Sequence, residues 1–250
     1  MKKQILSLFL AGALSLSLFG CSGQTASQNT SQDVPVPSTE SPSAGTVEEL
    51  HLGTTAANDT FTTFVENGAF GKMCYNSFVT APFWQTDPNG EVKPFLVTDW
   101  TVSQDSTTIT CDLALDQGVT WHDGEPLTMD DVLFTFDYNI NVRKSSYGSY
   151  VDYAEQIDED TIKVVLKEPG AYQWLKLVAG YFYVQPKHIW ENIDNPKDYR
   201  GEDAVIGCGP YRFVNVDEDA QTSYYEAVSD TYLGREVTVK KVSLRSFDSN

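Results

Sequence analysis

Apolar and polar residues alternate in short runs from residue 49 onward, a pattern typical of strands with one buried face. In the run 107–115, every second residue from Ile109 to Leu115 is apolar, so these side chains would share one face. Polar turn residues separate neighbouring runs, so we expect hairpins. The predicted strands are 49–55, 100–103, 107–115, two strands within 154–167 around a turn at 158–160, 211–216, 222–227 and 237–245, and Asp87-Pro88-Asn89-Gly90 predicts a further turn between extended segments.

Three segments have helical spacing instead. Residues 66–78 mix small and apolar positions, and residues 171–178 form a second candidate, followed by a short aromatic strand. The third helix would begin after Thr128, a good N-cap, with Asp130 and Asp131 near the unpaired amides of its first turn. Its apolar stripe would comprise Val132, Leu133, Phe136 and Ile140. Hairpins interspersed with helices predict a mixed α and β fold.

The first twenty residues have the layout of a secretory signal peptide. Lys2 and Lys3 precede a 15-residue apolar stretch from Ile5 to Phe19. A permanent membrane-spanning helix needs about 20 residues, so a cleaved signal over residues 1–20 is favoured.

The signal ends in Leu18-Phe19-Gly20-Cys21, which resembles the lipobox of bacterial lipoproteins. That resemblance implies that Cys21 is diacylated and becomes the new N-terminus; the alternative is an ordinary thiol behind a standard signal peptide. Residues 21–46 are dominated by small and polar side chains, with too little apolar surface to offset the entropy of folding. We therefore predict a flexible tether that holds the folded part on the order of 25 to 30 Å from the lipid.

Charge and composition exclude some classes of partner. The formal net charge is −18, from 35 acidic and 17 basic residues, and no run of Lys and Arg interrupts it. Nucleic-acid binding needs a basic surface, so we expect no nucleic-acid partner.

The cysteines and histidines have no spacing typical of a metal site. Cys74, Cys111 and Cys208 contain no C-x-x-C pair, and one disulfide is possible, although buried free thiols are the simpler expectation. His51, His122 and His188 form no i, i+4 pair. We predict no cofactor and no dedicated metal site.

Five motifs in order resemble the family 5 solute-binding proteins of bacterial ABC importers, the dipeptide, oligopeptide and nickel-binding group. The most specific is Gly118-Val119-Thr120-Trp121-His122-Asp123-Gly124-Glu125-Pro126-Leu127-Thr128-Met129-Asp130-Asp131-Val132, similar to the family's G-V-x-F-H-D-G-x-P-L-T-A-x-D-V. The others are 93–100, 166–169, 185–190 and 206–213, the last containing Gly207-Cys208-Gly209-Pro210. These motifs are mostly turns and caps, so they identify a scaffold and no ligand.

This resemblance implies a type II periplasmic-binding-protein-like fold of mixed α and β structure, with residues 47–250 as the first lobe and the second lobe absent. It implies a monomeric, extracytoplasmic, lipid-anchored binding protein, not an enzyme. Such a protein would capture a dipeptide, an oligopeptide or a similar extended solute and deliver it to permease subunits in the membrane.

By position, the resemblance also implies three ligand-binding segments in this lobe. The first contains Glu66, Asn67 and Gly68, the second Tyr147 and Tyr150, and the third Tyr181 and Tyr183. Tyrosines suit such a site because each ring has a flat apolar face and a polar tip. For each tyrosine taken alone, packing between surface and core is the commoner role.

Three alternatives remain at the level of sequence. A nickel or metal-chelate importer is weakened because 146–150 and 180–183 contain no arginine, although Arg143 and Lys144 lie close to the first of these segments. A secreted lipoprotein hydrolase is weakened because G-x-S-x-G and H-E-x-x-H do not occur, nor S-x-x-K with supporting partners. A receptor without transport would use the same fold.

Overall fold

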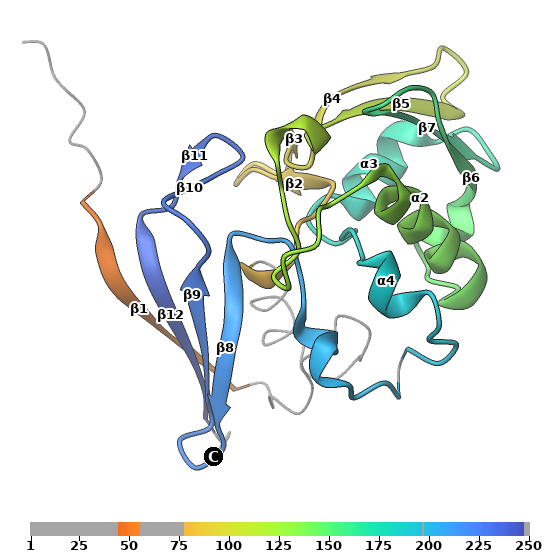
Figure 1. Ribbon diagram of the computed structural model, residues 1–250. Coiled ribbons are helices and arrows are strands. Elements are labelled where there is room, and N and C mark those ends of the chain that lie inside the picture. The colour runs from red at the N-terminus through yellow and green to blue at the C-terminus, as the bar shows by residue number, and fades with distance from the viewer. Residues whose placement is uncertain (1–44, 56–77, 197, 248–250) are drawn as a thin grey trace, which may run out of the picture. The chain divides into compact units, whose positions relative to one another are not determined.

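The computed structural model describes residues 45–55, 78–196 and 198–247. Within these residues, the strands form two four-stranded sheets and two small hairpins (Figure 1). Several sequence predictions lie outside the described residues: the signal peptide, Cys21, most of the tether, most of the helix at 66–78, Cys74, and the site residues Glu66, Asn67 and Gly68.

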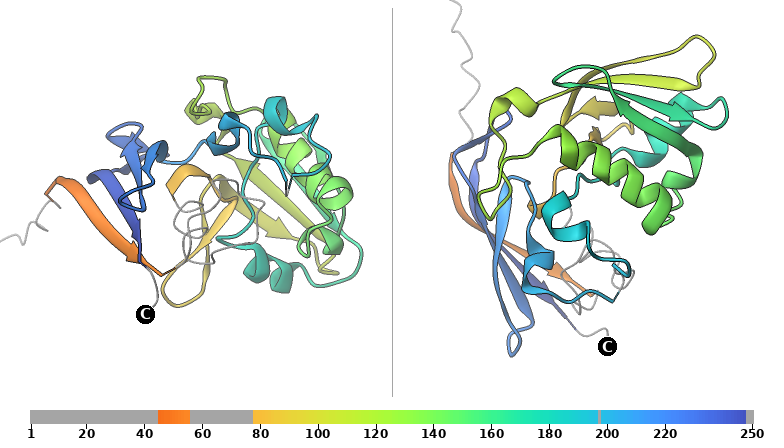
Figure 2. Two further views of the ribbon diagram at one scale, coloured as in Figure 1. Left: turned by 90° about the horizontal axis from the view of Figure 1, so that it is seen from below. Right: turned by 45° about the vertical axis from the view of Figure 1, so that its right-hand side comes forward.

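The first sheet has the strand order β1-β12-β9-β8, and its buried face packs Tyr225, Val242 and Leu244 against Val79. Its last three strands pair antiparallel, as predicted. β12 also pairs parallel with β1, and the two lie side by side in both views of Figure 2. The strands are β1 (Val47–Thr54), β8 (Tyr211–Asp217), β9 (Thr222–Ala227) and β12 (Val239–Ser246).

The second sheet is fully antiparallel, in the order β4-β5-β7-β6, and contains the two other predicted hairpins. Ile109, Cys111, Ile162 and Val164 are buried on one face, which confirms the period-two prediction. Leu115 is an exception, because the chain leaves the sheet after Leu113 and Leu115 enters a 3-10 turn. The strands are β4 (Val97–Val102), β5 (Thr108–Leu113), β6 (Val151–Gln156) and β7 (Thr161–Leu166).

Two short hairpins complete the described strands. The predicted turn at 87–90 joins β2 (Trp84–Thr86) to β3 (Val92–Pro94), and the Gly90 amide donates to the Asp87 carbonyl at 2.9 Å. β10 (Thr231–Tyr232) and β11 (Arg235–Glu236) form the second hairpin. The short aromatic strand predicted after residue 178 is reduced to one bridge between Pro82 and Tyr183.

Three helices lie entirely within the described part of the chain. α2 (Met129–Asp137) begins after Thr128 in a reciprocal capping box with Asp131, as the sequence predicts, and runs into a π-helical turn at Tyr138–Val142. α3 covers Ala171–Val178, the predicted range, and α4 is a single turn at Lys187–Trp190. The shorter 3-10 turns are Leu115–Gln117, Gly148–Tyr150 and Glu202–Val205.

One apolar core joins α2 and α3 to the second sheet. It contains Phe136 from α2 and Trp174 from α3 together with the buried strand residues. Phe182 packs against both rings, at centroid distances of 5.0 Å from Phe136 and 6.1 Å from Trp174. Cys111 and Cys208 are both buried free thiols, as expected. Among the described residues, no helix is both long enough and apolar enough to span a bilayer.

Candidate functional site

The carboxyl ends of the parallel strands β1 and β12 lie together. The Phe247 amide donates to the Thr54 carbonyl at 2.7 Å, and the Ser246 amide donates to the Gln221 carbonyl at 2.8 Å. In α/β proteins, ligands bind outside the carboxyl ends of parallel strands, where loops and unpaired backbone groups converge. This edge is therefore the first candidate site.

The aromatic ring of Phe247 is exposed to solvent at this edge. Phe247 is 51% exposed, and its ring lies so close to Gly53 that a Cβ there would be 2.9 Å from a ring carbon. The Arg245 guanidinium lies 5.3 Å from the ring centroid, within cation–π range. Sequence reasoning missed Phe247, because its place depends on the parallel pairing of two strands far apart in the chain.

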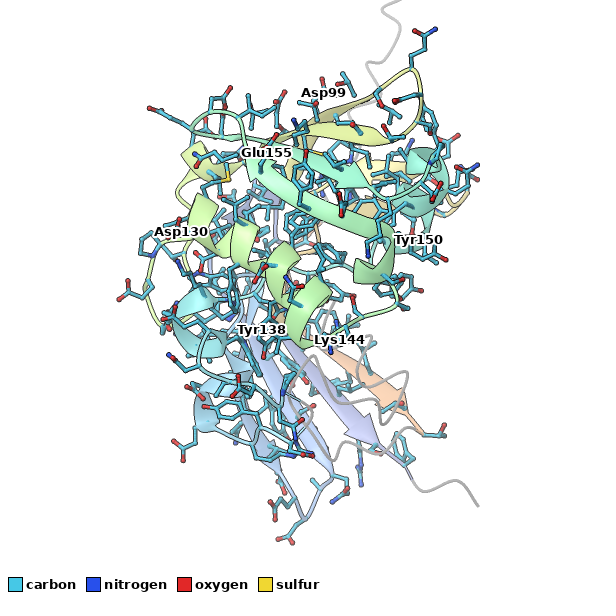
Figure 3. The ribbon with its side chains drawn as sticks, turned by 90° about the vertical axis from the view of Figure 1, so that its right-hand side faces the viewer. Asp99, Asp130, Tyr138, Lys144, Tyr150 and Glu155 are labelled. Carbon is cyan, nitrogen blue, oxygen red and sulfur yellow. The ribbon has the colours of Figure 1, made fainter. Side chains whose placement is uncertain are left out.

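The predicted tyrosines Tyr147 and Tyr150 have different environments. Tyr147 is half-buried against the central core, and its carbonyl accepts from Trp174 Nε1 at 3.1 Å. Tyr150 is 54% exposed and lies at the surface in Figure 3, while its carbonyl accepts the Lys167 amide at 3.0 Å. Of this pair, only Tyr150 is mostly exposed, so only Tyr150 is accessible to a solute.

The second predicted pair, Tyr181 and Tyr183, divides in the same way. Tyr181 is 51% exposed, whereas Tyr183 is buried and its hydroxyl donates to the Gly180 carbonyl. The residue between them, Phe182, packs on Trp174, whose indole bonds the Tyr147 carbonyl. The structure therefore brings the two predicted tyrosine segments to the same tryptophan and leaves one exposed ring in each.

The long motif forms a tight loop ahead of α2. Thr120 and Pro126 form an isolated antiparallel β-bridge, and the Trp121 amide donates to the Glu125 carbonyl at 2.7 Å. Gly124 has φ of +99°, a conformation that glycine adopts without strain. The His122 amide donates to the Gly207 carbonyl at 2.9 Å, so this loop is attached directly to the later Gly-Cys-Gly motif.

Asp131 holds the loop to two helices. One carboxylate oxygen, Oδ2, accepts from Trp121 Nε1 at 3.3 Å and from the Thr128 amide and hydroxyl, each at 2.9 Å. The other, Oδ1, accepts the Lys187 amide at the start of α4 at 2.8 Å. Asp131 lies in the first turn and accepts an unpaired amide, as predicted, and it is also a buried structural anchor, because it is 4% exposed.

The second glycine motif allows a close backbone approach. A Cβ on Gly207 would lie 2.0 Å from the Val79 carbonyl oxygen, and one on Gly209 would lie 2.5 Å from the Phe78 carbonyl oxygen. His122 Nε2 lies 3.0 Å from the Gly209 carbonyl, an acceptor, so Nε2 carries the proton. Burial lowers the pKa of His122, and nearby Arg212 adds to this effect. The ring is therefore neutral at pH 7.

The histidines show no arrangement for metal binding. His188 Nε2 lies 2.8 Å from Asp123 Oδ2, and His51 Nδ1 lies 2.6 Å from Ser243 Oγ. In the part of the chain that the structure describes, no group of three His, Cys, Asp or Glu side chains could hold a metal ion. The described histidine contacts are structural, and the carboxyl ends of β1 and β12 remain the candidate binding site.

The fold defines the class of protein. It matches the substrate-binding protein CtaP of an ABC transporter from Listeria monocytogenes with a TM-score of 0.67 at 26% identity, covering 82% of this chain and 41% of that one. It also matches the oligopeptide-binding protein AppA from Bacillus subtilis, solved with a nonapeptide, with a TM-score of 0.70 at 19% identity and the same coverage. The chain thus has one lobe of the type II periplasmic-binding-protein fold.

The sequence comparison then gives the family. Residues 91–250 match the model of the bacterial extracellular solute-binding proteins, family 5, and the chain belongs to that family. Over 140 residues it is 31% identical to the probable peptide-binding protein YejA of Agrobacterium fabrum, covering 53% of this chain and 22% of that protein. The chain therefore spans less than half the length of the relatives it matches.

Proposed function

We propose that this chain is part of the extracytoplasmic substrate-binding component of an ABC importer and that the complete protein binds a dipeptide, an oligopeptide or a similar extended solute without catalysing a reaction. The observation that carries the proposal is the shared carboxyl edge of β1 and β12 in a member of family 5. The likeness to a probable peptide-binding protein supports a peptide as the solute. Permease subunits in the membrane would receive it.

The site would combine this edge with the segments predicted from the sequence. Glu66, Asn67 and Gly68 come after β1 in the sequence, and we keep them as proposed ligand contacts. Phe247 adds a fixed aromatic surface there. Among the tyrosines, exposure favours Tyr150 and Tyr181 as ligand contacts, whereas Tyr147 and Tyr183 would support them through backbone and packing contacts.

A metal chelate is a less favoured solute. The arginine nearest to the tyrosine segment, Arg143, donates to Asn139 Oδ1 at 3.2 Å at the end of the π-helical turn. That bond gives Arg143 a structural role within its own helix.

The binding test uses the protein expressed from its complete gene and calorimetry with pooled synthetic peptides, with free amino acids as the comparison. We expect saturable binding of peptides. Tyr150→Ala and Tyr181→Ala should each weaken it by about tenfold, the effect of losing roughly 1.4 kcal/mol of aromatic contact. Tyr172→Ala is the matched control, since Tyr172 is 61% exposed on α3 and lies outside the predicted site. Absence of peptide binding would refute the proposed function.

The anchor has a separate test. We propose that residues 1–20 are removed, that Cys21 carries the lipid, and that residues 21–46 tether a monomeric binding domain outside the cytoplasm, facing the cell surface or periplasm. Fractionation of cells should recover the protein with membranes, and Cys21→Ser should release it. A Cys21→Ser variant that stays with the membrane would contradict lipidation at this residue.

A further inference from the structure

A hollow of about 540 Å³ lies between the long motif loop and the β9–β10 connection, in a different part of the fold from the carboxyl edge of β1 and β12. Its volume is within the range of about 300–1,000 Å³ that is typical of small-molecule sites. The lining residues come from 117–122 and 124 on one side, and from 209, 212, 227–229 and 231–233 on the other.

The charge of this hollow differs from that of the protein. The formal net charge of the chain is −18, yet no acidic side chain lines the hollow. Arg212 is its one charged lining residue among the residues described, because the His122 ring is neutral. A small anion would therefore meet an attractive charge here, and Glu226, the carboxylate that pairs with Arg212, does not line this hollow.

Arg212 has donor capacity to spare. Its Nε donates to Glu226 Oε1 on the neighbouring strand at 2.7 Å, and Nη2 donates to the same oxygen. Nη1 has no acceptor among the described residues. An arginine that uses one side of its planar fork for a neighbour can present its end to a second carboxylate. Arg212 also lines an adjoining hollow of about 380 Å³, which contains Glu226.

The far wall is a short hairpin fixed to the rest of the fold. The Tyr232 hydroxyl donates to the Cys208 carbonyl, and Arg235 donates to the Pro94 carbonyl at 3.1 Å. Leu233 (φ +48°) and Gly234 (φ +70°) form the two-residue turn of this hairpin, in which both central residues take positive φ. Leu233 packs against the central core, which holds this wall in place.

We propose that this hollow is a second binding site, separate from the peptide site, which takes a small organic acid. Its carboxylate would lie on the end of the Arg212 guanidinium, and its apolar body would contact Val119 and Val228. Thr120 and Ser229 add hydroxyl groups to the lining of the site.

The test uses fluorine NMR of 4-fluorobenzoate titrated with the full chain, and 4-fluorobenzamide as the neutral analogue. We expect saturable binding of the acid only. Arg212→Gln should weaken it at least tenfold, since a charge-assisted pair contributes about 1.5–3 kcal/mol. Lys163→Gln is the matched control, because Lys163 likewise pairs across a strand with a carboxylate, Glu155, on the other sheet. It should leave binding unchanged.

A second variant tests the cavity itself without changing charge. Val228→Trp fills the hollow at a residue that is 43% exposed, so the fold should tolerate it, and binding should be lost. Circular dichroism checks that each variant is folded. Absence of saturable binding at millimolar acid, equal binding of the amide, or an equal loss in Lys163→Gln would overturn the proposal.

Discussion

Asp131→Asn isolates the role of one buried carboxylate in joining the motif loop to two helices. In the folded protein, Asp131 accepts hydrogen bonds from four donors and is 4% exposed. Asparagine has almost the same shape but only one oxygen. In its best orientation the amide oxygen replaces Oδ2, and the NH2 group then faces the Lys187 amide, so that two donors meet.

The magnitude follows from this geometry. At least one hydrogen bond to a charged group is lost, at a cost of about 1.5–3 kcal/mol, and the Lys187 amide at the start of α4 loses its partner. The three remaining bonds weaken because the oxygen is no longer charged. We expect the free energy of unfolding to fall by about 3 kcal/mol.

Urea unfolding followed by tryptophan fluorescence measures the change, and Asp130→Asn is the matched control. Asp130 is the adjacent residue and also bonds Lys187, through an exposed ion pair of 2.9 Å whose carboxylate side chain is 74% exposed. Exposed pairs contribute little, so this variant should stay close to wild type. Equal stability of the two variants would refute the assignment of Asp131 as an anchor.

Three further predictions concern the same scaffold. Gly207→Ala should destabilise the protein far more than Gly90→Ala, because a Cβ on residue 207 would lie 2.0 Å from the Val79 carbonyl oxygen. A Cβ on residue 90 would face open space, so at φ +78° that substitution should cost only about 1 kcal/mol. Similar urea midpoints for the two variants would contradict this prediction. Burial lowers the pKa of His122, so the unfolded state takes up the proton first as pH falls below 6.5. The stability of the wild type relative to His122→Asn should therefore decrease from pH 7 to 5. A stability difference that does not change with pH would contradict this prediction. Burial raises the thiol pKa of Cys111 and Cys208, so iodoacetamide should modify these thiols only after unfolding. Peptide mapping by mass spectrometry measures the modification. Rapid modification of both thiols in the native protein would contradict their burial.

Local elements were predictable where the signal lies within a few neighbouring residues. The hairpins of the second sheet follow from alternation at 107–115 and 154–167, and α3 follows from its helical period. The Thr128 cap was recognisable because its partner lies three residues away. Leu115 continued the apolar alternation but lies outside β5, because the sheet ended before the pattern did.

The candidate sites were predictable only in part. The tyrosine segments came from a resemblance, and the structure adds that Tyr150 and Tyr181 are exposed while Tyr183 is buried. The residues adjacent in sequence do not show which tyrosine of each pair is buried, because burial depends on how the segments pack around Trp174 and Phe182.

By itself, the sequence determined the hairpins, two helix positions, the resemblance to family 5 and an acidic charge that disfavours nucleic acid. Tertiary structure alone decided the parallel pairing of β1 with β12, the burial of Asp131, the exposed ring of Phe247 and the hollow around Arg212. The physical reason is sequence separation. Turns, caps and alternation are set by neighbours along the chain, whereas an edge, a buried charge or a cavity exists only after distant segments have packed together.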